Sequence, residues 1–261
     1  MSSSNFQRAF GILTGISVGE YIRKRRLTLA GVELSSSNQK IIDISLKYTY
    51  ETPESFTKAF IRFHGLSPSI ARESGANLKS FSRLSIKIII EGGEVMDYRI
   101  ENKETFDVVA KVKVFSTVDS INKKEIPEFW TECYTNNTIN MLYTFTKASK
   151  ITGNGLLGIC NSECCADANT NFEYAIGIES DIKDMPKGFS VLKISAGTWA
   201  IFKCVGAMPD AIQIMWKRIY SEFFPQSDYN FVEGIDFEYY PQGDNSKSDY
   251  VSEIWIPVIK K

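Results

Sequence analysis

The chain has little of what most catalytic and metal sites need. It contains a single histidine, His64, among 261 residues. A zinc site takes about four nitrogen, sulfur or carboxylate ligands within reach of one another, and histidine-based acid–base catalysis would rest on His64 alone. That residue falls at the end of a predicted helix, among phenylalanines. We therefore expect His64 to be structural, and we expect no metal site and no cofactor.

Cysteine is also scarce, and its pattern is neither that of a disulfide framework nor that of a zinc motif. There are five cysteines, an odd number. Cys160, Cys164 and Cys165 lie close together, but not in the spacing Cys-x-x-Cys. No signal peptide precedes them, so we expect reduced thiols and a cytoplasmic protein. Since no apolar run approaches the roughly 20 residues that cross a bilayer, we expect no membrane partner.

Net charge is nearly absent from the whole chain, at −1, which excludes a uniform polycation. Its distribution is uneven, however. Residues 1–90 hold 13 Lys and Arg against 6 Asp and Glu, whereas residues 91–261 hold 17 against 25. A basic first third joined to an acidic remainder is typical of a nucleic-acid-binding module fused to another domain, although chance asymmetry gives the same totals. The length suits two domains.

Residues 38–68 predict two short helices joined by a tight turn. Asn38 is placed to cap the first helix, and Ile41, Ile44 and Tyr48 recur at helical spacing on one apolar face. Residues 49–51 are too few for anything but a turn. The pair of helices is either a helix-turn-helix or an ordinary helical hairpin of an α-rich domain.

The second of these helices has a clear start and a clear division of faces. Thr52 followed by Pro53 marks an N-cap and a first helical residue. Phe56, Phe60 and Phe63 form the core face at helical spacing. A different face carries charged residues that core packing does not need, and these are Glu54, Lys58 and Arg62.

The string KIIDISLKYTYETPESFTKAFIRFHGLSP, residues 40–68, closely resembles the second helix-turn-helix of AraC/XylS-type transcription regulators. One departure is Thr49, where that family usually has glycine. Because a β-branched residue does not adopt positive φ cheaply, we expect the turn to be slightly reshaped. The string FQRAFGILTGISVGEYIRKRRLTLA, residues 6–30, resembles the first recognition helix of the same family and the long helix that joins the two units.

The resemblance implies double-stranded DNA as a partner and assigns roles by position. Ser4 and Arg8 would face bases from the first recognition helix, Glu54 and Lys58 from the second, and Arg62 would contact a phosphate. Arginine and lysine read guanine edges and a carboxylate accepts from cytosine. For Glu54 the alternative is a charge favoured only by the helix dipole.

The beginning of the chain departs from the family pattern. The helices that support the first recognition helix in the family are not present before Met1, so we expect the first half of the DNA-binding domain to be incomplete, in a truncated product or a partial sequence. Ser17 and Glu20 then form a capping box for the long joining helix. We expect that helix to turn a basic run, residues 23–26, outward and the following apolar residues inward: Tyr21, Ile22, Leu29 and Val32.

From Met96 the hydrophobic period changes from helical to two, which predicts strands. The expected order of elements is strand, helix, strand, strand, and it occurs twice. The predicted helices cover residues 127–134 and 209–224, and the last two strands of each half are GLLGIC and FEYAIGIES, then IDFEYYPQG and VSEIWIPVI. Such a duplication predicts two similar half-domains around a shared cleft.

This pattern, with GTWAIFKCVG and the closing EIWIPV, resembles the GyrI-like effector-binding domain over residues 95–261. Fusion to an AraC-type domain is a known arrangement, as in regulators of the Rob type. The resemblance implies an α+β domain of two βαββ repeats around a cleft. In drug-sensing relatives the cleft binds lipophilic cations through a buried glutamate and aromatic side chains.

The residues themselves offer two candidate glutamates for such a site. Strand alternation puts Glu253 and Trp255 on one face of the last strand, and Glu238 and Tyr240 on one face of another. A carboxylate among aromatic rings suits a hydrophobic cation, with cation–π contact contributing ~1–2 kcal/mol when desolvated. The next candidates are Trp199 and Trp130. Either glutamate can dominate, and the alternative for the aromatics is that they only fill two cores.

The sequence thus predicts a multi-domain chain: a partial all-α helix-turn-helix domain over residues 1–75, a linker over 76–94, and the α+β domain over 95–261. We expect a transcription regulator, not an enzyme, that senses a small lipophilic or cationic molecule. The alternatives are a ligand-sequestering protein with a defunct DNA-binding half and, third, a GyrI-like hydrolase. No dimer is required, because AraC-type domains with two units can bind DNA as monomers, and the oligomeric state stays open.

Overall fold

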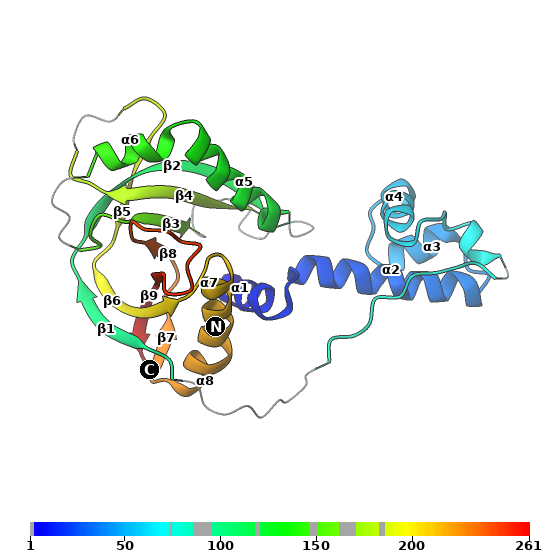
Figure 1. The fold of residues 1–261 in the computed structure, drawn as a ribbon. Coiled ribbons are helices and arrows are strands. Elements are labelled where there is room, and N and C mark those ends of the chain that lie inside the picture. The colour runs from blue at the N-terminus through cyan, green and yellow to red at the C-terminus, as the bar shows by residue number, and fades with distance from the viewer. Residues whose placement is uncertain are drawn as a thin grey trace. The chain divides into compact units, whose positions relative to one another are not determined.

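The computed structural model describes residues 3–73, 75–85, 95–117, 121–146, 151–161, 171–182 and 186–261. The chain divides into two compact units (Figure 1). The helical unit is Val18–Gly92, and the sheet unit combines Met1–Ser17 with Gly93–Lys261. This differs at the start of the chain from the expected helical domain over 1–75. The reason is that the first helix packs on the sheet unit, as described below.

Four elements make up the helical unit over the described residues: α2 (Val18–Ser36), α3 (Ile41–Lys47), α4 (Pro53–His64) and a 3-10 turn (Ile70–Arg72). All of them contribute to one apolar core. Its fully or nearly fully buried members are Leu27, Ala30, Leu34, Ile44, Phe56, Phe60 and Ala71. The predicted two-helix hairpin is therefore present and is packed against the long helix.

The predicted inner face of α2 was wrong. Ile22, Leu29 and Val32 are exposed. The buried positions follow a neighbouring stripe that includes Leu27, Ala30 and Leu34, and His64 of α4 packs against α2 at Gly31. A Cβ atom built on Gly31 would lie 2.9 Å from the ring of His64, so the missing side chain permits this close helix contact.

His64 explains why the two helices meet there. Its Nε2 lies 3.0 Å from the carbonyl oxygen of Leu27, and its Nδ1 accepts from the backbone N–H of Lys79 at 3.2 Å. Since Nδ1 accepts, Nε2 carries the proton and donates to Leu27. Burial lowers the pKa of His64, which favours this neutral form. His64 is therefore structural, as its position among phenylalanines predicts.

The start of α4 agrees with the sequence, and the two features before it do not. Thr52 accepts a hydrogen bond from the backbone N–H of Ser55 at 3.1 Å, and Pro53 is the first helical residue. The N-cap of α3 is Lys40, without a side-chain cap, so the capping role of Asn38 was wrong. Thr49 adopts φ = 66°, the left-handed conformation itself, so the expected reshaping of the turn was also wrong.

The sheet unit contains a nine-stranded antiparallel sheet, counted over the described residues, with the order β1-β6-β9-β8-β3-β4-β2-β5 and β7 on β9. The strands are β1 (Tyr98–Lys103), β2 (Phe106–Ser116), β3 (Leu156–Asn161), β4 (Asn171–Glu179), β5 (Ser190–Ile194), β6 (Gly197–Val205), β7 (Tyr229–Phe231), β8 (Ile235–Tyr240) and β9 (Val251–Lys260). The helices of this unit are α1 (Ser3–Thr14), α5 (Asn122–Thr135), α6 (Thr138–Thr144), α7 (Asp210–Arg218), the π-helical turn Ile219–Phe223, and α8 (Phe224–Gln226).

The strand order confirms the predicted duplication. The set β3-β4-β2, with α5 and α6, matches the set β8-β9-β6, with α7, and the two sets join where β3 pairs with β8. The edge strands are exchanged between the halves: β1 precedes β2 in the chain but pairs with β6, and β5 precedes β6 but pairs with β2. The short elements α6 and β7 were not predicted.

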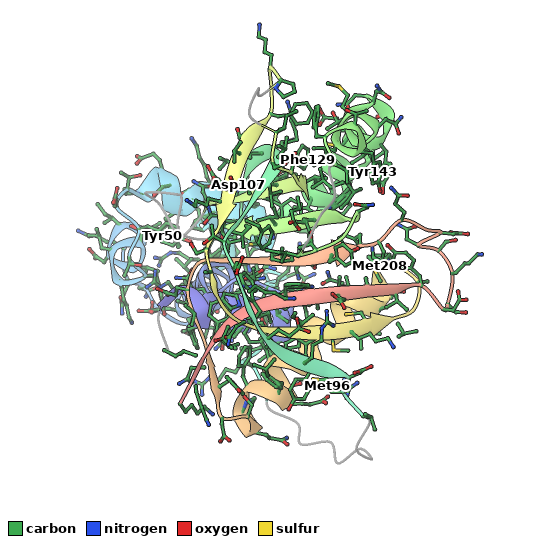
Figure 2. The ribbon with its side chains drawn as sticks, turned by 90° about the vertical axis from the view of Figure 1, so that its left-hand side faces the viewer. Tyr50, Met96, Asp107, Phe129, Tyr143 and Met208 are labelled. Atoms are coloured by element: carbon green, nitrogen blue, oxygen red, sulfur yellow. The ribbon has the colours of Figure 1, made fainter. Side chains whose placement is uncertain are left out.

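The sheet has two faces with different cores. On the helix-covered face, α7 and the π-helical turn pack over one half, while α5 and α6 pack over the other, where Phe129 and Tyr143 join one cluster (Figure 2). On the opposite face, which we call the inner face, the buried core comes from strands alone and includes Phe106, Trp199 and Trp255. Any site near the helices must use side chains of the helix-covered face.

The left-handed Thr49 gives a test of local strain. Replacing Thr49 with glycine should stabilise the helical unit by roughly 1 kcal/mol, because a β-branched residue is strained at positive φ. All four tryptophans lie in the sheet unit, so urea unfolding followed by far-UV circular dichroism and by tryptophan fluorescence separates the two units. Asn137→Gly is the control: Asn137 has φ = 68°, but asparagine tolerates this conformation. An equal gain in both variants would contradict the strain argument.

Candidate effector site and DNA-facing helix

Strand β8 brings acidic and aromatic side chains to the middle of the helix-covered face. Because side chains alternate along a strand, Asp236, Glu238 and Tyr240 point to the same side. Trp216 of α7 and Trp130 of α5 reach the same point from the two halves of the domain. We call these five residues the acidic–aromatic cluster. It lies where the two repeats meet, beside the pairing of β3 with β8.

Glu238 is held at the centre of the cluster by two donors from the protein. Trp216 Nε1 donates to Glu238 Oε1 at 2.7 Å, and the Tyr240 hydroxyl donates to Oε2 at 2.7 Å. The ring of Trp130 meets the ring of Tyr240 edge-on, at 5.4 Å between centroids. The residue Glu238 is only partly exposed, and its carboxylate is surrounded by aromatic rings.

A glycine on the neighbouring strand makes room for this arrangement. Gly158 of β3 lies opposite Glu238 in the register. A Cβ atom at Gly158 would lie 2.5 Å from the Tyr174 hydroxyl and 3.4 Å from both Glu238 and Trp130. Trp130 Nε1 donates to the Tyr174 hydroxyl at 2.9 Å. Glycine is therefore the residue that this position allows without displacing the cluster.

Burial shapes the protonation of the cluster. It raises the pKa of Glu238, against the hydrogen bonds from Trp216 and Tyr240 that lower it. Burial also raises the pKa of Tyr240 far above its usual range, and the nearby charge of Glu238 adds to that shift. The tyrosine therefore stays protonated and remains a donor to the glutamate.

Asp236 is satisfied by a residue from the far end of the chain. Arg8 of α1 donates from both Nη atoms to the two carboxylate oxygens of Asp236, the Nη2 bond being 2.6 Å long. The guanidinium also lies 4.7 Å from the ring centroid of Trp216. Asp236 is 1% exposed and Arg8 21%. Burial opposes the charge on Arg8, but the attraction of Asp236 outweighs it and raises the pKa of Arg8.

Arg8 was expected to face DNA bases, and in this structure its guanidinium is engaged within the sheet unit instead. Ala9 and Ile12 of the same helix pack against the core under α7. These contacts are the physical reason that α1 groups with the sheet unit. Ser4 falls in α1 as well, and its side chain lies outside the described part of the structure.

The six expected ligand residues do not form one site. Glu238, Tyr240 and Trp130 come together in the acidic–aromatic cluster. The other three, Glu253, Trp255 and Trp199, belong to the opposite side of the sheet, since Trp199 and Trp255 are members of the inner-face core.

The charge of Glu253 is already paired within the protein. It accepts from Trp255 Nε1 at 2.8 Å and from Arg99 at 2.7 Å. Trp255 is stacked on Phe237 at 5.2 Å between centroids. Glu253 therefore already pairs with the cation of Arg99, and the tryptophan beside it is packed in the core. Glu238 is the better placed of the two candidates.

Sequence reasoning missed Asp236 and Arg8 as members of the site, and it treated Trp216 as core. The signal for Asp236 was present, since it stands two residues before Glu238 on a strand and must share its face. No local signal marks the pairing of Arg8 with Asp236, because 228 positions separate them.

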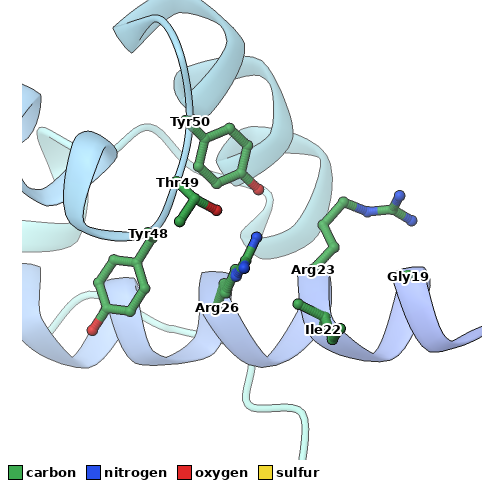
Figure 3. Close-up of a pocket in the computed structure, with 7 residues that line it drawn as sticks. All are labelled: Gly19, Ile22, Arg23, Arg26, Tyr48, Thr49 and Tyr50. Carbon is green, nitrogen blue, oxygen red and sulfur yellow. The ribbon is translucent and has the colours of Figure 1, made fainter.

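The helical unit presents the charged side chains that sequence reasoning assigned to DNA. Glu54, Lys58 and Arg62 of α4 are exposed, while Phe56 and Phe60 on the other side of the helix are buried. Beside the turn before α4, the unit has a hollow whose lining is shown in Figure 3. The lining residues are Gly19, Ile22, Arg23, Arg26, Tyr48, Thr49 and Tyr50.

The described residues also bear on metal binding, membrane spanning and free thiols. Among the described residues there is no group of three or more His, Cys, Asp and Glu side chains arranged to hold a metal ion. Within the same residues, no helix is both long enough and apolar enough to span a membrane. Cys133, Cys160 and Cys204 are free thiols, while Cys164 and Cys165 lie outside the described residues.

The bond from Trp216 to Glu238 predicts different costs for two tryptophans. Trp216→Phe should destabilise the sheet unit by about 1.5–3 kcal/mol beyond the loss of ring area, because Glu238 loses a donor. Trp199→Phe is the control, since Trp199 is equally buried, 3% against 5% exposed, and over the described residues its Nε1 has no hydrogen-bond partner. Urea unfolding followed by circular dichroism measures both. Equal losses would show that the Trp216 bond contributes nothing specific.

Comparison with known proteins assigns two parts of the chain to families. The family of integron-associated effector-binding proteins matches residues 99–258, and a helix-turn-helix domain family matches residues 1–74. Among curated proteins, the transcriptional activator AarP of Providencia stuartii is 39% identical over 84 residues, which is 32% of this chain and 62% of AarP. The right origin-binding protein of Escherichia coli K12 is 37% identical over 73 residues, which is 28% of this chain and 25% of that protein. The chain thus spans less than two thirds of either relative.

Solved structures share the fold of the sheet unit. A putative transcription regulation protein of Staphylococcus aureus MU50 matches 63% of this chain and 99% of its own, with 23% identity and a TM-score of 0.53. The structure of SAV2435 bound to tetraphenylphosphonium matches 63% of this chain and 94% of its own, with 22% identity and a TM-score of 0.53. The strand order, the duplicated halves and the family match agree: the chain belongs to the integron-associated effector-binding proteins, and an AraC-type helix-turn-helix domain precedes that domain.

Proposed function

We propose that the chain is a DNA-binding transcription regulator whose sheet unit binds an organic cation at the acidic–aromatic cluster. The observation that carries the ligand class is the carboxylate of Glu238, which is set among the rings of Trp216, Tyr240 and Trp130. Charge pairing and cation–π contact in such a setting contribute ~1–2 kcal/mol per ring when desolvated. A related fold that holds tetraphenylphosphonium, a lipophilic cation, supports the same class of ligand.

The helical unit supports the DNA-binding half of the proposal. Its exposed α4 face carries Lys58 as a base-reading candidate and Arg62 as a phosphate contact. Glu54 either accepts from a cytosine amino group or serves only as a favourable charge at the helix N-terminus. Relatives such as AarP are named as transcriptional activators, which supports the same function for this chain.

The presence of a DNA-binding site and a ligand-binding site in one chain is not enough for regulation. The ligand must bind one arrangement of the protein more tightly than another, and that arrangement must differ in its affinity for DNA. A cation bound at Glu238 would lie near the positive charge of Arg8 in α1. The match to the helix-turn-helix family includes this helix. We propose that α1 is the element through which the ligand acts.

Two alternatives remain from the sequence. A sequestering protein would bind the ligand but not DNA, and a DNA titration distinguishes it from a regulator. For a hydrolase, the raised pKa of Glu238 and its hydrogen bond from Tyr240 supply an acid–base pair. However, the same carboxylate is committed to two donors, and we propose that the chain is not an enzyme.

DNA binding should depend on Lys58. In titrations of the full chain onto duplex DNA across a salt series, affinity should fall with rising salt as counterions are released. On a selected operator, Lys58→Ala should cost about 1–3 kcal/mol if Lys58 reads a base. Lys124→Ala is the control, because Lys124 is a solvent-exposed lysine of the sheet unit and the change in charge is identical. Equal losses of affinity in Lys58→Ala and Lys124→Ala, or no DNA binding at low salt, would contradict the proposal of a DNA-binding regulator.

Cation binding should depend on pH through Glu238. Its pKa is raised, so its contribution to stability is complete below the ordinary pKa of glutamate and is lost as pH rises through the raised value. The affinity for a fixed cation runs the opposite way: tetraphenylphosphonium should bind more weakly as pH falls through that raised value. Asp236, Arg8 and Tyr240 face the same carboxylate. Calorimetric titration at several pH values tests this, and Glu238→Gln should flatten the profile; an unchanged profile would place the cation elsewhere.

A further inference from the structure

We infer that Asp236 and Trp216 form a guanidinium-binding site, which Arg8 occupies from within the chain and which an external guanidinium or amidinium compound enters by displacing Arg8. The inference rests on the proposed cation-binding function of the sheet unit. It adds a chemical class of ligand, a second subsite beside Glu238, and a competitor that the chain itself supplies.

The site has the geometry that a planar, forked donor needs. Both Nη atoms of Arg8 donate to Asp236, one to each carboxylate oxygen. The carbon of the guanidinium lies 4.7 Å from the centroid of the Trp216 ring. Paired N–H donors matched to a carboxylate, with a ring over the planar cation, favour guanidinium over a point charge such as an ammonium.

The two carboxylates of the cluster differ in what they require of a ligand. Glu238 already accepts from Trp216 and Tyr240, so a cation without donors leaves it satisfied. Asp236 is 1% exposed, and over the described residues its side-chain oxygens accept from Arg8. A ligand that displaces Arg8 must therefore bring N–H donors of its own, because a buried carboxylate left without them is costly.

The position of α1 gives the competition a consequence. The helix-turn-helix family match covers residues 1–74 and so includes Arg8, while the structure packs α1 on the sheet unit. One guanidinium cannot bind Asp236 and a DNA base at the same time. A guanidinium ligand at Asp236 therefore releases the residue that sequence position assigns to the first recognition helix.

The test uses the full chain and phenylguanidinium as the probe. If Arg8 competes, Arg8→Ala should bind phenylguanidinium at least about tenfold more tightly than the wild type, since the apparent affinity scales with the fraction of chains whose site is empty. Phenylguanidinium should also restore part of the thermal stability that Arg8→Ala loses. Unchanged affinity in Arg8→Ala would overturn the inference.

The inner face supplies a matched control. Arg99 pairs with Glu253 at 2.7 Å and lies 5.9 Å from the ring of Trp255, so it also combines an arginine, a carboxylate and a tryptophan. Glu253 is 18% exposed, however, against 1% for Asp236. Arg99→Ala should leave the affinity for phenylguanidinium unchanged, and a gain equal to that of Arg8→Ala would overturn the assignment to Asp236.

A second measurement does not depend on the folding of a variant. With saturating phenylguanidinium, amide hydrogen exchange in α1 of the wild-type chain should accelerate, because Arg8 no longer anchors the helix. Binding without that acceleration would overturn the competition. Tetraphenylphosphonium separates the two proposals: if it binds and phenylguanidinium does not, the function stands and the guanidinium site fails. If neither cation binds, both fail.

Discussion

The sheet unit is organised around two carboxylates that stand two residues apart on one strand, on the helix-covered face of the sheet. Placing Asp236 and Glu238 in a largely apolar interior is unfavourable unless each oxygen finds a donor. Trp216 and Tyr240 supply donors to Glu238, and Arg8 supplies both donors to Asp236. These requirements fix the rotation of α7 over the sheet and hold α1 against it. The same interactions that stabilise the unit therefore define its site.

Two similar constellations in the sheet unit differ in burial. Arg8, Asp236 and Trp216 on the helix-covered face repeat the chemistry of Arg99, Glu253 and Trp255 on the other. The Arg99 pair is more exposed, and surface ion pairs contribute little, with a median near 0–1 kcal/mol. At Asp236, where water is excluded, the loss of the partner leaves a buried charge, at a cost of about 3–5 kcal/mol. Selectivity for a donor-bearing cation follows from that difference.

Much of the fold was predictable from local pattern, and the site only in part. Thr52 and Pro53 located the start of α4, and strand alternation located nearly every strand and both repeats. The predicted inner side of α2 was wrong because the buried stripe runs through Gly31, where His64 of α4 leaves no room for a side chain. Glu238 was one of two open candidates, since alternation shows which residues share a face but not which face meets the helices. That choice depends on strand pairing between distant segments, as does the pairing of Arg8 with Asp236.

The position of α1 suggests how ligand and DNA binding can be coupled through one helix. In sequence, α1 belongs to the stretch that matches a helix-turn-helix domain; in structure, it belongs to the sheet unit. A segment that two partners compete for is a two-state element, and both partners then bias the same equilibrium. The size of the coupling is bounded by the difference in ligand affinity between the two states. In the proposed competition that difference depends on one side chain, because Arg8 pairs with the buried Asp236 and lies over the ring of Trp216.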